Sequence, residues 1–108
     1  MGPKARALLY DIQQAGTLVE RFSSGKSFDE YVADPLLCSG VERQLEIIGE
    51  ALNRLAKIGP YAVARITDYR RIIALRDILA HGYARVDHQV IWNIIERSLP
   101  SFAGRSML

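Results

Sequence analysis

The stretch "DPLLCSGVERQLEIIGEALNRLAKIGP", residues 34 to 60, decides the fold. Asp34 and Pro35 mark a helix start, because aspartate caps the free backbone N–H groups and proline at the first helical position loses no hydrogen bond. Apolar residues then recur every three or four positions over several turns, at Val41, Leu45, Ile48, Leu52 and Leu55. This pattern predicts a long central helix from Pro35 to about Lys57, stopped by Gly59 and Pro60.

Two helices are predicted before this central element. The first runs from about Lys4 to Phe22 and ends at a Ser-Ser-Gly sequence; its apolar positions are Leu8, Ile12, Ala15 and Val19. The second is short and begins at Ser27. Ser27 and Glu30 match a capping box, in which each side chain satisfies a backbone N–H group of the other residue.

Two more helices are predicted after it. Thr67 or Asp68 is expected to cap one that ends at Gly82, and Asp87 to cap a last one that continues to about Arg97. The buried side of the last helix is expected to consist of Val90, Ile91, Trp92, Ile94 and Ile95.

The fold class predicted from these segments is all-α, a small up-and-down bundle of about five helices. No run shows strict apolar and polar alternation, and no Asn-Gly or Asp-Gly hairpin signal occurs. Residues 61 to 66 are left open, with a short helix as one option.

Length and composition predict one folded domain over residues 1–108. The chain is 49% hydrophobic and 24% charged, and no apolar run approaches the roughly 20 residues that span a bilayer. Without a secretory apolar core at its start, the chain is expected to be cytoplasmic, with no membrane association. The single cysteine, Cys38, excludes an internal disulfide and a metal cage built of cysteines, and its simplest interpretation is a small buried residue.

Positive charge is concentrated in the second half of the chain. The net charge is +2, yet the segment from Arg54 to Arg85 holds seven basic and two acidic residues and the remainder is −3. A phosphate-bearing partner would be drawn to this segment. A solvated helix face is the simpler alternative.

The stretch "RDILAHGY", residues 76 to 83, places an arginine among apolar neighbours. On a helical wheel Arg76 falls in the middle of the side formed by Ile72, Ile73, Leu75, Leu79 and Ala80. A guanidinium on such a side is almost never left unpaired. Arg76 is therefore expected to meet a carboxylate, a phosphate or a cleft between subunits.

His81 lies roughly 140° around the wheel from Arg76, near Arg70 and Asp77. Asp77 and His81 are four residues apart, so the carboxylate is expected to orient the imidazole for acid–base chemistry. In the purely structural alternative, Arg76 forms an ion pair, His81 caps the helix end and Tyr83 is a core residue.

No metal site is predicted. The second histidine, His88, follows His81 by seven residues, but Gly82 and the Asp87 cap stand between them, so the two are not expected to share a face. Two scattered histidines offer too few ligands.

The motif Arg76, four residues, His81, one residue, Tyr83 resembles that of the HepT-like toxins of the HEPN superfamily. The segments "SFDEYVADP", "RQLEIIGEALNRL", "YRRIIALRDILAHGYARVD" and "VIWNIIERSLP" also resemble family segments in their usual order, over about residues 4 to 100.

This resemblance implies a HEPN-like bundle that dimerises through the motif helix and acts as a metal-independent RNA endonuclease without a cofactor. Arg76 would stabilise charge on the phosphate, and His81 would act on the attacking 2′-hydroxyl or the leaving oxygen. The expected products are a 2′,3′-cyclic phosphate or 3′-phosphate and a 5′-hydroxyl. The basic side chains expected to bind the RNA are Arg70, Arg71 and Arg85.

The resemblance also implies a protein partner, an antitoxin of the minimal nucleotidyltransferase (MNT) type that transfers AMP to Tyr83. Family members often carry asparagine after the motif arginine, where this chain has Asp77, whose negative charge would repel RNA phosphate. Glu50 is a conceivable partner of Arg76 on family similarity alone.

Two other functions remain open. The chain could be a non-catalytic accessory subunit that binds a nucleotidyltransferase and perhaps nucleotide, or a plain structural helical dimer.

Overall fold

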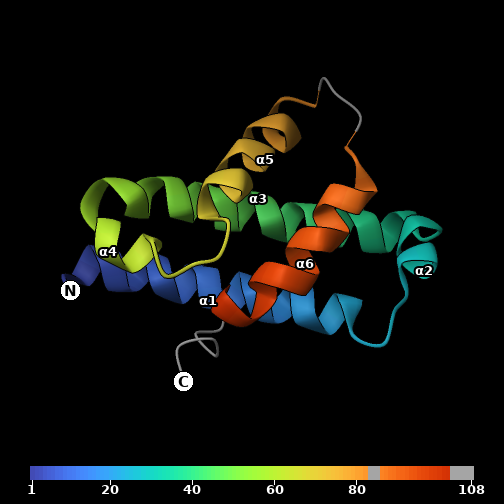
Figure 1. Cartoon of the computed structure of the whole chain (residues 1–108), viewed down its shortest axis with the longest axis horizontal. Helices are drawn as coiled ribbons and strands as arrows, with labels where there is room; N and C mark the ends of the chain where they lie inside the picture. The colour runs from blue at the N-terminus through green and yellow to red at the C-terminus, as the bar shows by residue number, and fades with distance from the viewer. Residues whose placement is uncertain (83–85, 103–108) are drawn as a thin grey trace.

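The computed structural model describes residues 1–82 and 86–102, and within them it contains six helices and no strand. The helices are α1 (Pro3–Ser23), α2 (Phe28–Val32), α3 (Pro35–Ile58), α4 (Pro60–Val63), α5 (Tyr69–His81) and α6 (His88–Phe102) (Figure 1). The all-α prediction is confirmed, and the segment left open from residue 61 forms most of α4. In the part of the chain that is described, no helix has the length and apolar character needed to cross a membrane.

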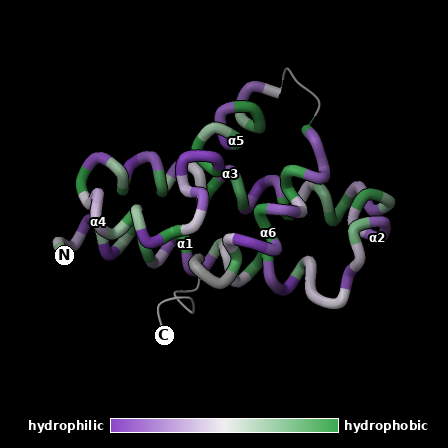
Figure 2. The backbone as a smooth tube through the Cα atoms, viewed as in Figure 1, coloured by the Kyte–Doolittle hydropathy of each residue, from purple (hydrophilic) through white to green (hydrophobic). Residues whose placement is uncertain are grey.

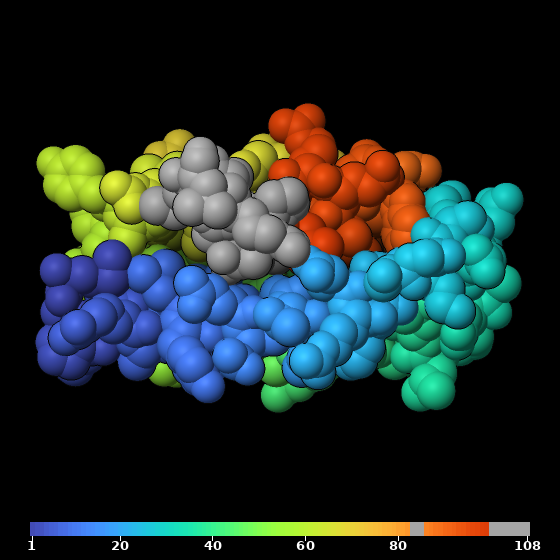
Figure 3. Space-filling model, turned by 90° about the horizontal axis from the view of Figure 1, so that it is seen from below, coloured from blue at the N-terminus to red at the C-terminus, as the bar shows by residue number. Residues whose placement is uncertain are grey.

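The two long helices, α1 and α3, lie antiparallel and form the base of the fold (Figure 1). Helix α6 crosses α1 and also contacts α2, while α5 packs mainly on α3. Seen from below, α1 fills much of the lower half of the view, with α6 beside it (Figure 3). Helix α5 is therefore supported mostly from one side.

The predicted apolar side of α3 forms the centre of the core. Its five members, Val41, Leu45, Ile48, Leu52 and Leu55, are completely buried. Hydrophobic residues recur along α1, α3 and α6 between hydrophilic ones (Figure 2), and Ile12, Ile91 and Ile94 are buried against the same core. The helical periodicity of the sequence thus predicted correctly which residues pack together.

The predicted helix starts are confirmed in three places. Ser27 and Glu30 form the capping box, with bonds of 2.9 and 3.1 Å between the backbone N–H of one residue and the side chain of the other. The carboxylate of Asp34 accepts a hydrogen bond from the backbone N–H of Leu37 at 3.1 Å. The carboxylate of Asp87 accepts one from the backbone N–H of Gln89 at 2.9 Å.

The predicted cap of α5 is wrong. Asp68 stands at the start of α5 in the left-handed region, with φ of 58°, and its side chain makes no capping bond. Its carboxylate instead pairs with Arg97 of α6 at 3.3 Å, and the carbonyl of Thr67 accepts the hydroxyl of Ser98 at 3.0 Å. The start of α5 is therefore joined to α6.

The predicted end of α6 near Arg97 is also wrong, because the helix continues to Phe102. Ser98 is completely buried and Leu99 packs on the core, so the buried side of α6 extends past Arg97.

Helices α3 and α5 approach each other closely at Gly49. A Cβ atom at this position would lie 2.4 Å from the Cβ of Arg76 and 3.1 Å from the carbonyl oxygen of Ile72. No side chain fits at that distance, so the absence of one at Gly49 determines how closely Arg76 approaches α3.

Gly49→Ala is expected to destabilise the fold by about 1 to 3 kcal/mol, because the added methyl forces α5 away from α3. This loss of stability is opposite in sign to the usual effect, because replacing glycine by alanine inside a helix normally stabilises it by about 1 kcal/mol. Urea unfolding followed by circular dichroism measures it.

Gly40→Ala is the matched control on the same helix. A Cβ there would meet only the ring of Phe22, at 3.3 Å, and this partly buried side chain can shift. We expect a change within about 1 kcal/mol. Equal effects of the two substitutions would contradict the role of Gly49.

Candidate functional site

Arg76 extends from α5 toward α3 and is mostly buried, with its side chain 21% exposed. Its Nη2 donates to Oε2 of Glu50, which is the partner expected from the family resemblance. The other oxygen of Glu50 accepts a hydrogen bond from Nε of Arg54, one turn further along α3, at 3.0 Å. The carboxylate of Glu50 is thus held between two guanidinium groups.

Asp77 provides a second carboxylate for Arg76. Nη1 of Arg76 donates to Oδ1 of Asp77 at 2.8 Å, and the Asp77 side chain is 57% exposed. Arg76 therefore meets carboxylates, one of the three partners that the wheel left open. Any phosphate that binds Arg76 must compete with Asp77 at the exposed side.

The His81 imidazole makes one hydrogen bond with the backbone of Asp77. Its Nδ1 lies 2.6 Å from the backbone carbonyl oxygen of Asp77, one helical turn back. A carbonyl only accepts hydrogen bonds, so Nδ1 carries the proton and the lone pair of the neutral imidazole lies on Nε2. This bond to the backbone orients the ring.

The end of α5 is as predicted. His81 is the last residue of the helix, and Gly82 follows in the left-handed conformation with φ of 64°. Tyr83 and Arg85 lie outside the described residues. His81 itself is exposed.

The predicted RNA-binding residues Arg70 and Arg71 are both exposed on α5. Nε of Arg70 donates to the hydroxyl of Tyr69 at 3.1 Å, and its guanidinium stands 5.5 Å from the centre of that ring. Ile78 is an apolar residue on the outer side of this helix and is 44% exposed. Basic, apolar and imidazole groups therefore share the surface of α5 that α3 does not cover.

A cavity of about 330 Å³ adjoins Arg76 between α1, α3 and α5. Charges of both signs line it, contributed by Asp11, Arg43, Glu46, Glu50, Arg54 and Arg76. This balance distinguishes the cavity from the exposed side of α5, where Arg70 and Arg71 place positive charge.

Sequence reasoning missed two contributors to this site. Gly49 allows the close approach of the helices, and Arg54 holds Glu50 from the far side. The Glu50 and Arg54 pair had a signal, because residues four apart on a helix are neighbours. Gly49 had none beyond being a glycine inside a helix.

A second cluster, formed by Cys38, Glu42 and His88, was also missed. One potential ligand atom from each residue lies within 4.8 Å of the others. His88 was considered only beside His81, whereas its neighbours are on α3.

Residues 12–106 match the family described as "Ribonuclease HepT-like". The chain is 36% identical over 89 residues to "Putative RNase TTE0752" of Caldanaerobacter subterraneus subsp. tengcongensis, an alignment that covers 82% of this chain and 78% of the relative. It is 33% identical over 100 residues to "Probable ribonuclease HepT" of Thermococcus cleftensis, covering 90% and 87%.

A further relative, "Putative RNase MJ0127" of Methanocaldococcus jannaschii, is 33% identical over 98 residues, which cover 89% of this chain and 78% of the relative. No solved structure matches the chain significantly. The match over residues 12–106, together with the helical bundle in which Arg76 and His81 lie on one helix, leads to one conclusion: this chain belongs to the HepT-like ribonuclease family of the HEPN superfamily.

Proposed function

We propose that this chain is the toxin of a toxin–antitoxin pair, an RNA endonuclease that uses Arg76 and His81. The observation that carries the proposal is the fixed geometry of these two residues on α5. Arg76 is held by Glu50 at the edge of the exposed surface, and His81 is held in the tautomer whose Nε2 can accept a proton.

In the proposed reaction Nε2 of His81 takes the proton of the ribose 2′-hydroxyl, and the 2′-oxygen attacks the adjacent phosphorus. The bond from phosphorus to the 5′-oxygen breaks, and this oxygen takes a proton from an imidazolium. The products are a 2′,3′-cyclic phosphate and a 5′-hydroxyl. Arg76 stabilises the negative charge that develops on the phosphoryl oxygens, and no metal is required.

Glu50 and Arg54 act as positioning residues in this proposal. Glu50 holds one end of the Arg76 guanidinium, and Arg54 holds Glu50 in turn. Among the described residues, the other end of the guanidinium contacts only the half-exposed Asp77, which RNA phosphate can displace.

A homodimer through α5 would complete the site. The outer surface of α5 carries the exposed Ile78 beside Asp77 and His81, and α3 supports the helix from the other side. Two copies that meet on this surface would bring together two sets of Arg76 and His81, so that one imidazole accepts a proton while the other donates one.

The proposed partner is a nucleotidyltransferase antitoxin of the MNT type. The hydroxyl of Tyr83 attacks the α-phosphorus of ATP, a phosphodiester to AMP forms, and pyrophosphate leaves. Tyr83 follows His81 by two residues, so an adenylate there adds bulk and negative charge beside the proposed RNA surface.

One observation favours the second candidate, a non-catalytic subunit that binds a nucleotidyltransferase. Arg76 is already neutralised by two carboxylates, Glu50 and Asp77, and such an arginine can serve as a structural ion pair. RNA cleavage by the purified chain separates the two functions.

Arg76→Ala and His81→Ala are each expected to lower the rate of RNA cleavage by at least about 100-fold, since one removes charge stabilisation and the other proton transfer. Cleavage of labelled RNA is measured with a chelator present, and Arg21→Ala on α1 serves as a control for loss of positive charge. Full activity in both folded variants would refute the proposed chemistry.

Asp77→Asn is expected to raise kcat/KM about 3- to 10-fold, mainly through a lower KM, because it removes the negative charge that competes with RNA phosphate for Arg76. Asp29→Asn removes the same charge from α2 and should leave kcat/KM unchanged. An unchanged or lower value for Asp77→Asn would show that this carboxylate does not oppose RNA binding.

Incubation with the partner transferase and ATP is expected to increase the intact mass of the chain by one or more AMP groups, each less one water. Tyr83→Phe should abolish the increase, because phenylalanine has no hydroxyl to attack the nucleotide. Tyr61→Phe, which alters an almost fully exposed tyrosine on α4, should not. Modification that persists in Tyr83→Phe would place the acceptor elsewhere.

A further inference from the structure

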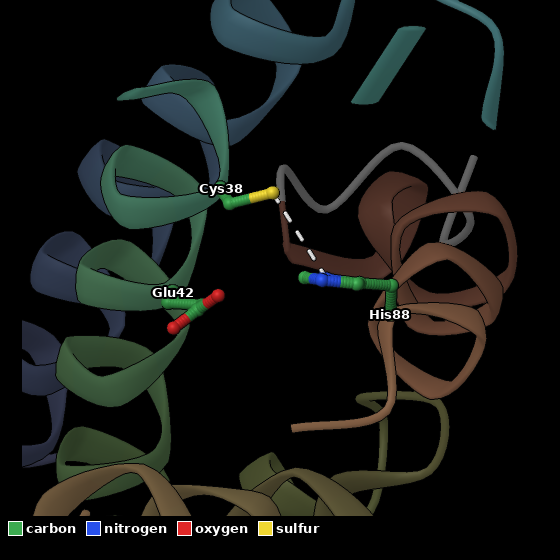
Figure 4. A group of neighbouring side chains, drawn as sticks. All are labelled: Cys38, Glu42 and His88. Atoms are coloured by element: carbon green, nitrogen blue, oxygen red, sulfur yellow. Dashed lines mark hydrogen bonds between the residues drawn. The ribbon is translucent and has the colours of Figure 1, made fainter. Parts of the chain in front are cut away.

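A cluster of three side chains with metal-ligand chemistry lies away from the proposed RNA site. Cys38 and Glu42 are one turn apart on α3, and His88 is the first residue of α6 (Figure 4). The sulfur of Cys38 and the imidazole of His88 point toward each other, and Glu42 faces the same space from below. Residues fifty positions apart in the sequence are thus brought together.

The distances in this cluster are close to those of a zinc site. Sγ of Cys38 lies 3.9 Å from Nδ1 of His88, and one ligand atom from each of the three residues lies within 4.8 Å of the others. With Zn–S near 2.3 Å and Zn–N near 2.0 Å, a tetrahedral zinc ion separates its sulfur and nitrogen ligands by about 3.5 Å. Small side-chain rotations would bring all three atoms to one ion.

Polar groups in and beside this cluster differ in their hydrogen bonding, and the Cys38 thiol donates to the backbone carbonyl oxygen of Tyr31 at 3.2 Å. The hydroxyl of Tyr31 is completely buried and has no hydrogen-bond partner among the described residues. Tyr31 lies beside the cluster, because its ring centre is 5.7 Å from that of His88. Within the described chain, the Glu42 carboxylate makes no hydrogen bond or ion pair.

We infer that Cys38, Glu42 and His88 form a binding site for a zinc ion that joins α3 to the start of α6. One thiolate, one imidazole and one carboxylate are a ligand set that zinc accepts, and the spacing of four residues on a helix directs two ligands to one ion. Three protein ligands leave a fourth position for water. The thiol of Cys38 releases its proton to solvent when the metal binds.

The site is accessible to an ion from solvent. A cleft of about 670 Å³ adjoins it, with Phe28, Val32, Glu42 and His88 among its lining residues. Cys38 itself is 7% exposed, so the ion would bind between a buried sulfur and two half-exposed groups.

This site differs from the proposed RNA site in place and in role. Eight residues of α3 separate Glu42 from Glu50, a rise of about 12 Å along the helix. The ion would hold one end of the connection from residue 82 to 87, whose other end carries His81. The inference does not depend on RNA cleavage.

Zinc binding to the untagged, full-length chain tests the inference, by competition with a chromophoric zinc chelator. We expect one zinc per chain. Loss of even an outer-shell partner costs about 10- to 100-fold in metal affinity, so Cys38→Ser, Glu42→Gln and His88→Gln should each weaken binding by at least about tenfold. His81→Gln removes the only other histidine and should leave the affinity unchanged.

Two further measurements keep the test informative if a variant is less stable. Cobalt(II) bound to the chain should show a sulfur-to-cobalt charge-transfer absorption that Cys38→Ser abolishes. Zinc should raise the melting temperature of the unaltered chain and of His81→Gln, but not that of His88→Gln, whose altered side chain is half-exposed. No zinc binding by the unaltered chain, or binding that His88→Gln leaves unchanged, would overturn the inference.

Discussion

The close approach of α5 to α3 at Gly49 is the constraint on which the rest of the structure depends. Helix α5 packs on α3 and makes few contacts with any helix other than α3. Its position is therefore determined largely by this crossing. Ile72 and Leu75 supply buried area there, and Gly49 provides the space for the backbone of α5. A helix that carries exposed functional groups on its outer side needs such support on its inner side.

The same crossing explains how an arginine is accommodated on an apolar helix side. Because the helices are so close, the aliphatic part of Arg76 packs over Gly49 while its guanidinium extends to Glu50. Burying this charge alone would be costly, and the carboxylate one residue after the glycine removes that cost. The sequence "GE" at positions 49 and 50 therefore provides space and charge for the same side chain.

Periodicity and capping rules predicted most of the fold, because they depend on neighbours in the sequence. The buried side of α3 and the caps at Ser27, Asp34 and Asp87 follow from residues within one turn. The failures involve contacts between distant segments. Asp68 has the chemistry of a cap, but Arg97 takes its carboxylate, and no local pattern contains that information.

The same distinction applies to the two candidate sites. Arg76 and His81 were identifiable because the motif lies within one helix, and the wheel already showed that the arginine needed a carboxylate, a phosphate or a subunit cleft. The hydrogen bond between His81 and the backbone carbonyl of Asp77 was not predicted, because a helical wheel represents side chains only. Cys38, Glu42 and His88 were not predicted as a group, since a lone cysteine and a lone histidine have simple structural explanations when taken singly. Only the position of His88, the first residue of α6, beside the N-terminal part of α3 brings them together. A ligand set divided between helices is therefore found through the fold rather than through a motif.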